Sequence, residues 1–370
     1  MAERGAVPRV SQARRRALRL IGSFTSPLLP DDYLELVNPL WSTRELRGRI
    51  ERVERESTTA VTVSIKPGWE WDGHQPGQYL RLGIEVDGVH HWRAYSLTSD
   101  PERRDGWIAI TPKLVESGKV SPYLFRRVRP GTIVRLGGVE GTFVLPDPLP
   151  PRLLFISAGS GITPIMSMLR SLARRGQLDD VTHLHCARRV EEVIFARELR
   201  ELADRHRGYR LNVRLTGAQG RLVPAQLEHL CPDWHEREAL VCGPTGLLQA
   251  LSERWQQDGD PARMHIERFQ PEGGTINNLA PGQRGAGGTI DFCSSGLHAS
   301  SDGEQPILVA GESVGAKLPY GCRMGICHSC VGRLRSGQVR DLRTGRVHGQ
   351  RGELLRTCIN APEGTVEIEL

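Results

Sequence analysis

The sequence predicts a chain of three domains, each of a different fold class: an antiparallel β-barrel, a parallel α/β domain and a small α+β domain. Three observations predict it. Short alternating strands separated by turn residues fill residues 43–147, and apolar strands alternate with helical patterns through residues 148–270. After a linker at residues 271–288, rich in glycine, residues 289–370 carry closely spaced cysteines. A length of 370 residues accommodates this arrangement.

Composition excludes several classes of protein. The net charge is +6, but only four of the 49 basic residues are lysine and no aromatic residues cluster among them, so we expect no nucleic-acid binding. The longest uncharged run, Leu153–Leu169, is shorter than the ~18 residues of a membrane-spanning helix. Residues 1–19 lack the apolar segment of a signal peptide. We therefore expect a cytoplasmic protein whose eight cysteines are reduced or metal-bound.

Residues 1–42 form an extension that precedes the barrel. Within it, Gln12–Ile21 has the pattern of a short basic helix, which suits the inner, anionic face of a plasma membrane. A helix docked on the protein itself, or a frayed terminus, explains the same pattern and is the interpretation we favour. The apolar stretch Leu34–Trp41 is expected to pack on the body of the protein.

Four segments are predicted to be strands of the barrel, and a tetrad of residues ends a further strand. The segments are Thr59–Ile65, Tyr79–Val86, Trp107–Thr111 and Gly131–Leu136. The tetrad Arg93-Ala94-Tyr95-Ser96 resembles the flavin motif of the ferredoxin–NADP reductase family. In that family Arg93 would bind a flavin phosphate, Tyr95 would lie against the isoalloxazine ring, and Ser96 would hydrogen-bond its N5 edge. Tyr95 and Ser96 are thus candidate catalytic residues.

A second segment points to the same cofactor. Gly118, Val120, Ser121 and Leu124 resemble the family's G-x-x-S-x-x-L segment, in which a helix start meets a pyrophosphate. Ser121 is expected to cap this helix, with Pro122 at its first position. A pyrophosphate site implies FAD as the flavin.

The α/β domain begins with a strand, a glycine turn and a helix. The strand Arg152–Ser157 leads into AGSGITP, which contains Gly159, Ser160, Gly161, Thr163 and Pro164. This order places a dinucleotide's phosphates at a helix N-terminus. The string AGSGITPIMSML resembles the NAD(P) segment of the same reductase family. The resemblance implies a nicotinamide nucleotide as electron donor.

Arginines after the next strand bear on which nucleotide binds. We expect a strand at Val181–Cys186, a helix at Val193–Ala203 and a strand at Tyr209–Leu215. Arg188 and Arg197 are candidates for binding a 2′-phosphate, which favours NADPH. The neighbouring Glu191 and Glu192 leave NADH open.

Two further segments complete the nucleotide site in relatives. Cys242, Gly243 and Pro244 resemble the family's C-G-P motif, which implies that Cys242 lies beside the nicotinamide C4 and is catalytic. Phe269 lies in the segment that approaches the flavin in relatives. The other cysteines outside the C-terminal loop, Cys186, Cys231 and Cys293, are expected to be buried structural residues.

The C-terminal cysteines have the spacing of an iron–sulfur site. Cys322, Cys327 and Cys330 are spaced C-x4-C-x2-C and Cys358 follows, which suits a plant-type [2Fe–2S] cluster. Structural zinc prefers paired C-x2-C knuckles, and disulfides need an oxidising compartment, so both alternatives are less favoured. Residues 288–370 resemble plant-type ferredoxins, which implies a β-grasp fold. Strands are expected at Thr289–Phe292 and Val366–Leu370, and a short helix from Glu312.

The combined resemblance implies an electron-transfer reductase of the phthalate-dioxygenase-reductase kind, with FAD in place of FMN. Electrons would pass from NADPH to FAD, to the cluster, and then to a partner protein. The motif set and NPLWSTRELRG resemble reductases that serve membrane-bound, di-iron acyl-CoA Δ9 desaturases of actinobacteria, involved in lipid metabolism. A reductase for an alkane or aromatic-ring hydroxylase or dioxygenase is the alternative. A flavin and iron–sulfur redox sensor without turnover is the alternative of another class.

Overall fold

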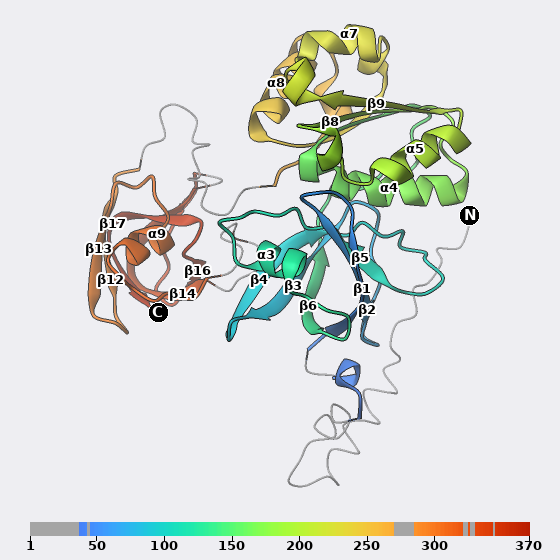
Figure 1. Cartoon of the computed structure of the whole chain (residues 1–370). Helices are drawn as coiled ribbons and strands as arrows, with labels where there is room; N and C mark the ends of the chain where they lie inside the picture. The colour runs from blue at the N-terminus through green and yellow to red at the C-terminus, as the bar shows by residue number, and fades with distance from the viewer. Residues whose placement is uncertain (1–36, 43–44, 270–284, 321–324, 326–329, 343–344) are drawn as a thin grey trace, which may run out of the picture. The chain divides into compact units, whose positions relative to one another are not determined.

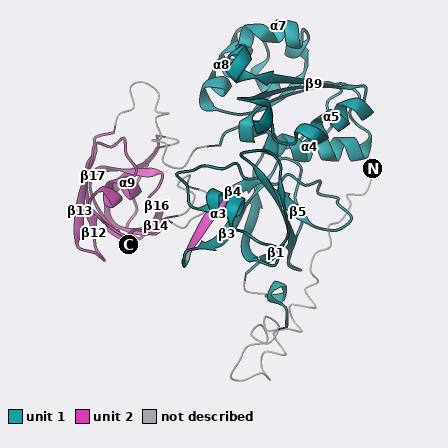
Figure 2. Ribbon diagram, in the orientation of Figure 1, with its two compact units in different colours: residues 1–88, 95–269 teal, residues 89–94, 270–370 magenta. Residues whose placement is uncertain are grey.

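The computed structural model describes residues 37–42, 45–269, 285–320, 325, 330–342 and 345–370 (Figure 1). It divides into two compact units, residues 1–88 with 95–269 and residues 89–94 with 270–370 (Figure 2). The first unit contains a parallel α/β sheet and an antiparallel sheet, except for residues 89–94 of that sheet, and residues 270–370 of the second unit contain a mixed sheet with one helix. The three predicted fold classes are confirmed. The predicted basic helix at residues 12–21 and most of the linker lie outside the described residues.

The antiparallel sheet has the strand order β4-β3-β6-β1-β2-β5. A bridge between Leu97, directly after β4, and Ile110 of β5 joins the two ends of this order and closes the barrel. Inward side chains such as Ile50, Val63 and Leu82 are fully buried because alternate residues of a strand face the same side. The elements are η1 (Pro39–Trp41), β1 (Arg47–Arg55), β2 (Val61–Pro67), β3 (Tyr79–Val86), β4 (Val89–Ser96), β5 (Ile108–Ile110), α3 (Val120–Arg126) and β6 (Ile133–Glu140).

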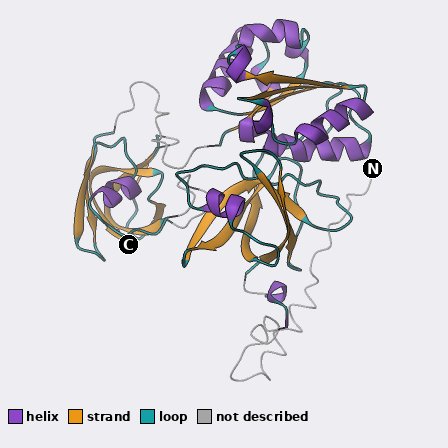
Figure 3. Ribbon diagram, in the orientation of Figure 1, coloured by secondary structure: helices purple, strands orange, loops and turns teal. Residues whose placement is uncertain are grey.

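The α/β sheet is entirely parallel, in the order β11-β10-β7-β8-β9. Helices flank this sheet, as parallel strands require crossover connections (Figure 3). The strands are β7 (Leu153–Ala158), β8 (Val181–Ala187), β9 (Tyr209–Leu215), β10 (Glu238–Cys242) and β11 (Met264–Glu267). The helices are α4 (Ile162–Arg175), α5 (Ala196–Arg205), α6 (Thr216–Gln219), α7 (Leu227–Leu230) and α8 (Thr245–Asp258).

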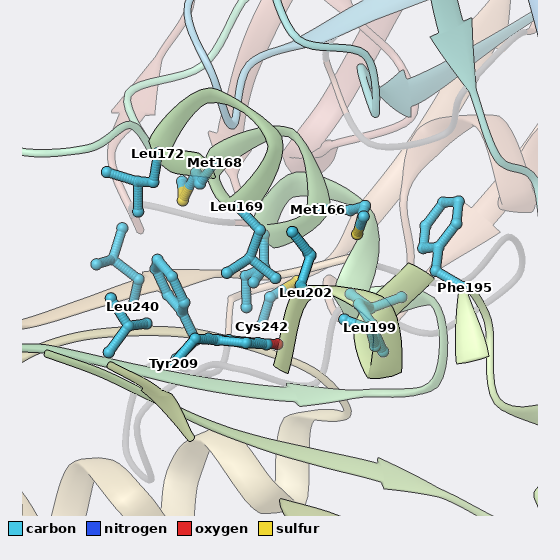
Figure 4. Close-up of a cluster of buried hydrophobic side chains, with 14 of the residues drawn as sticks. Met166, Met168, Leu169, Leu172, Phe195, Leu199, Leu202, Tyr209, Leu240 and Cys242 are labelled. Atoms are coloured by element: carbon cyan, nitrogen blue, oxygen red, sulfur yellow. The ribbon is translucent and has the colours of Figure 1, made fainter. Parts of the chain in front are cut away.

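One face of this sheet packs against α4 and α5. Met166 and Leu169 of α4 and Leu199 of α5 are fully buried together with Leu240 of β10 (Figure 4). The opposite face buries Trp234 and Trp255, whose ring centroids lie 4.5 Å apart. Burial on both faces fixes the strands, so the loops at their carboxyl ends start from a rigid edge.

Helix α4 also ties the α/β sheet to the barrel segment that follows β4. Ser167 Oγ donates a hydrogen bond to the Ser99 carbonyl at 2.7 Å, and Arg170 Nη1 donates to the Thr98 carbonyl at 2.6 Å. Arg174 Nε lies 2.5 Å from Asp100 Oδ2. These bonds join the helix that follows the glycine turn to residues 98–100, which follow the strand that ends in the Arg-x-Tyr-Ser tetrad.

The second unit holds a sheet of order β13-β12-β17-β14-β15, with β16 paired to β14. Strands β12 and β17 are parallel, while the other pairs are antiparallel. One core includes Phe292, Leu334, Ile368 and both Cys330 and Cys358. The elements are β12 (Gly288–Phe292), β13 (Leu297–Ser301), α9 (Ile307–Ser313), β14 (Val331–Asp341), β15 (Val347–His348), β16 (Leu354–Arg356) and β17 (Asn360–Glu369).

Three local predictions were wrong. Helix α9 spans Ile307–Ser313 and so ends where a helix was expected to begin at Glu312. Cys293 is exposed, because the inward positions of β12 are Ile290 and Phe292. Ser121 does not cap α3, which begins one residue earlier at Val120, after Lys119 in the N-cap position.

Candidate active site and cofactor sites

The glycine turn follows strand β7. Gly159 has φ +54°, and Gly159–Gly161 form a 3₁₀ turn that leads directly into α4. Thr163 Oγ1 donates to the Ser160 carbonyl at 2.9 Å, which holds the first turn of α4 against the loop. A Cβ at Gly161 would lie 2.2 Å from the Cys242 carbonyl oxygen. Only glycine therefore permits this close approach of the turn to β10.

Cys242 ends strand β10 beside that turn. Its side chain is fully buried, and burial, aided by the Glu267 carboxylate, raises the pKa of its thiol well above the usual value. Gly243 follows, and Pro244 occupies the N-cap position of α8. The structure thus brings Gly161 and Cys242 together from two parts of the chain 81 residues apart, and it places Cys242 there as a neutral thiol.

Glu267 is a neighbour of Cys242 that the sequence argument did not single out. It pairs with Cys242 in the parallel register of β10 and β11. Burial raises the pKa of Glu267 to about 7. The pKa of Tyr79 in the barrel is raised by its own burial and by Glu140, with a smaller contribution from Glu267. A half-buried acid that titrates near neutral pH at the end of β11 is suited to exchange a proton there.

Lys113 is a second residue that sequence reasoning missed. It follows β5, and its Nζ lies 3.7 Å from the position of a Cβ on Gly159 and 3.7 Å from Glu192 Oε2. A barrel cation thus reaches the glycine turn of the α/β sheet, where an anionic phosphate is expected. Lys113 is one of only four lysines in the chain, and this rarity is the sequence feature that could have singled it out.

The tetrad residues lie at the end of β4. Arg93 is half-buried, and its Nη1 donates to the Trp92 carbonyl at 2.8 Å. Tyr95 is half-buried against the barrel core, and Ser96 is buried. The roles of these three residues toward a flavin stay predictions.

The second flavin segment forms a turn and the short helix α3. The Gly118 amide donates to the Val115 carbonyl at 2.9 Å, and Val120 is buried in the barrel core. Ser121 Oγ lies 3.1 Å from the Val115 amide nitrogen, so its hydroxyl accepts from the preceding turn. The segment is held to the barrel by these contacts, and its role toward a pyrophosphate stays a prediction.

Three further candidates for the cofactor sites are Arg188, Arg197 and Phe269. Arg188 is exposed after β8, and its carbonyl accepts from the Gly217 amide at 2.9 Å. The Arg197 side chain is 92% exposed on α5 and lies 3.7 Å from Glu201. Phe269 is exposed at the end of the first unit. Arg188 follows the carboxyl end of β8, and its role toward a 2′-phosphate stays a prediction.

Two of the four expected cluster ligands are described, and they lie together. Cys330 and Cys358 are buried, and the Thr357 amide donates to the Cys330 carbonyl at 3.0 Å. The Gly325 amide lies 3.2 Å from Cys358 Sγ, a donor to the sulfur of the kind that iron–sulfur sites use. Gly325 has φ +72°, and a Cβ there would lie 2.6 Å from Ile359. Cys322 and Cys327 lie outside the described residues.

Family models match all three domains in order. Residues 56–145 match the oxidoreductase FAD-binding domain, residues 155–253 the oxidoreductase NAD-binding domain, and residues 292–363 the 2Fe-2S iron-sulfur cluster binding domain. An "NADPH oxidoreductase" of Mycobacterium tuberculosis is 49% identical over 96% of this chain and 92% of its own length. The chain belongs to the ferredoxin–NADP reductase family.

Other relatives of this reductase are named as components of oxygenase systems. The stachydrine N-demethylase reductase subunit of Rhizobium meliloti is 30% identical over 89% of this chain and 97% of its own length. Phthalate dioxygenase reductase shares the fold, with a TM-score of 0.58 at 19% identity over 88% of this chain and 97% of that chain. The reductase is thus an NAD(P)H-dependent flavin and iron–sulfur oxidoreductase that takes part in electron transfer.

The residues fit the three groups that the reductase binds. The close approach at Gly161 and the cation at Lys113 suit a nucleotide phosphate, and the Gly325 amide at Cys358 Sγ suits a sulfur-ligated cluster. The half-buried ring of Tyr95 suits a flavin. Among the described residues, no helix is long and apolar enough to cross a membrane.

The raised pKa of Glu267 predicts a pH-dependent stability. The unfolded chain releases the Glu267 proton near pH 4.5, whereas the folded protein holds it up to pH about 7. Stability should therefore fall as pH rises through that window. We expect Glu267→Gln to raise the melting temperature of the first unit relative to wild type at pH 8 and to leave it unchanged at pH 5. A difference between the two proteins that does not vary with pH would contradict this assignment.

Proposed function

We propose that this reductase passes electrons from NADPH through FAD and the [2Fe–2S] cluster to a di-iron, oxygen-activating partner, and that this partner is a membrane-bound acyl-CoA desaturase. FAD and the cluster, when bound, convert the electron pair of a hydride into successive single electrons. The observation that carries the proposal is the presence of flavin, nucleotide and cluster domains on one chain. A relative at 49% identity that is named "NADPH oxidoreductase" supports NADPH as the donor.

The protein's own groups have separate tasks in this scheme. The turn Gly159–Gly161 and the helix start at Thr163 bind and orient the nucleotide, with Lys113 opposite its phosphates. Cys242, neutral and buried, leaves room for the nicotinamide to meet the flavin. Tyr95 and Ser96 orient the flavin ring, and Arg93 with the segment at Gly118–Ser121 holds its phosphates. Cys322, Cys327, Cys330 and Cys358 hold the cluster.

If Arg188 binds the 2′-phosphate of NADPH, its removal should selectively weaken the binding of NADPH. We expect Arg188→Ala to raise the KM for NADPH about tenfold or more, because a charge-assisted bond to the 2′-phosphate is lost, and to leave the KM for NADH unchanged. Steady-state dye reduction with each nucleotide measures both values. Arg200→Ala, an exposed arginine on α5, is the control. An equal change for NADH and NADPH would remove Arg188 from the 2′-phosphate site.

The identity of the partner is tested by reconstitution. Purified reductase and NADPH are mixed with membranes that contain an acyl-CoA desaturase, and desaturated product is followed. A protein that lacks residues 1–42 is run beside it. The proposal expects product with the full chain, and less product but undiminished dye reduction with the shortened chain if that segment contacts the membrane.

A reductase for a hydroxylase or dioxygenase is the second candidate. It is favoured by relatives such as the stachydrine N-demethylase reductase subunit and a 3-ketosteroid-9-alpha-monooxygenase reductase component. The same reconstitution distinguishes the two candidates. Product with a soluble hydroxylase, and none with the desaturase membranes, would overturn the desaturase assignment and keep the electron-transfer function.

A further inference from the structure

Arg356 is joined to a cluster ligand through one residue. It is the last residue of β16 and lies two positions before Cys358. Its half-buried guanidinium donates through Nη1 to the carbonyl of Gly325, and the amide of the same Gly325 lies 3.2 Å from Cys358 Sγ. The guanidinium and the ligand sulfur therefore bind opposite ends of a single glycine.

The segment around Arg356 is fixed from the other side as well. Thr357 is fully buried, and both its amide and its Oγ1 donate to the Cys330 carbonyl, at 3.0 and 2.9 Å. Asn360 Nδ2 donates to the Arg356 carbonyl at 2.9 Å. Two ligands, Cys330 and Cys358, thus share one rigid frame with the arginine.

The guanidinium of Arg356 carries a permanent positive charge. Among the described residues, no carboxylate forms an ion pair with its guanidinium, and residues 321–329 of the loop contain no aspartate or glutamate. Its bond is to a carbonyl, which leaves the full positive charge in place. A partly buried cation interacts with nearby charges more strongly than one in water, because the local dielectric constant is lower.

We propose that Arg356 is a positioning residue for the iron–sulfur site that also raises the cluster's reduction potential. Reduction adds one negative charge to the cluster, and a fixed cation stabilises that charge. The guanidinium also holds the Gly325 carbonyl, which keeps the Gly325 amide directed at Cys358 Sγ. Hydrogen bonds to the sulfurs and net charge are two of the factors that set the reduction potential of such clusters.

Two substitutions separate charge from shape. Arg356→Gln keeps a donor for the Gly325 carbonyl and removes the charge, while Arg356→Lys keeps the charge. Arg351→Gln removes an exposed charge from the same domain as a control. The full-length holoprotein is titrated potentiometrically with dithionite and mediators, and the EPR signal of the reduced cluster is read at each potential. Cluster content is checked by visible absorption.

Arg356→Gln should lower the ratio of reduced to oxidised cluster about tenfold at a fixed potential, which is about 59 mV for one electron. Arg356→Lys and Arg351→Gln should stay close to wild type. An unchanged potential in Arg356→Gln would overturn the proposal. Loss of the cluster from both Arg356 variants would also overturn the proposal, because it would show that Arg356 has only a structural role. The titration uses neither NADPH nor an acceptor, so its outcome is independent of the proposed partner.

Discussion

Cys358→Ser protein should lack the visible absorption of the cluster and should reduce cytochrome c at least about 100-fold more slowly than wild type. Outer-shell changes alone cost 10–100-fold in metal affinity, so the loss of a ligand costs at least as much. Reduction of a two-electron dye by NADPH should continue, because the nucleotide turn at Gly159–Gly161 and the flavin residues Tyr95 and Ser96 lie in the other unit. Both rates are measured by steady-state absorbance.

A cysteine of the same domain provides the control for that experiment. Cys293 is exposed and is not among the expected ligands, so Cys293→Ser should retain the cluster and both activities. Rapid cytochrome c reduction by a cluster-free Cys358→Ser protein would show that electrons leave from the flavin. That result would contradict an exit through the iron–sulfur domain.

Gly161→Ala should slow the reduction of the flavin by NADPH about 100-fold, because a displacement of about 1 Å at a reacting centre has this effect. The new Cβ would lie 2.2 Å from the Cys242 carbonyl oxygen, a backbone atom, so the turn and strand β10 must separate. Stopped-flow absorbance with excess NADPH measures the rate. Flavin content and reduction by dithionite should be unchanged.

Gly246→Ala is the matched control, since a Cβ on this glycine of α8 meets nothing within 4 Å. It should reduce its flavin at the wild-type rate. An unaffected rate in Gly161→Ala would show that the nucleotide does not depend on the turn at Gly159–Gly161, and would place the donor elsewhere.

The sequence predicted best the elements in which the hydrophobic pattern and the flanking turn residues indicate the same boundaries. The strands Tyr79–Val86 and Tyr209–Leu215 have the bounds expected, because alternating or apolar runs there end at clear turn residues. The glycine turn was also predictable, since a strand, two glycines and a helix leave one local geometry. The close approach of Gly161 to Cys242 was not predicted, because periodicity alone does not place these two residues together.

Local misjudgements have identifiable physical reasons. Helix α9 was missed because its Gly311 reads as a helix breaker, whereas a Cβ there would lie 2.5 Å from Leu318, so packing requires glycine. Cys293 was predicted to be buried from residue type, although strand alternation after Phe292 directs it outward. Ser121 was expected to cap α3, but its hydroxyl binds the turn at Val115 instead.

The residues that escaped prediction depend on tertiary contacts. Lys113 reaches Gly159 from the barrel, and Glu267 meets Cys242 only because β10 and β11 are parallel neighbours. The raised pKa of Glu267 is a consequence of burial, which no local pattern displays. The role proposed for Arg356 likewise depends on its hydrogen bond to Gly325, 31 residues earlier in the chain.

Anaerobic addition of NADPH to the pure, full-length protein tests the central claim most directly, with visible absorption and low-temperature EPR recorded on one sample. The account predicts bleaching of an oxidised flavin and the appearance of the EPR signal of a reduced [2Fe–2S] cluster. A colourless protein that contains zinc in place of iron, or a flavin that bleaches with no cluster signal, would contradict it.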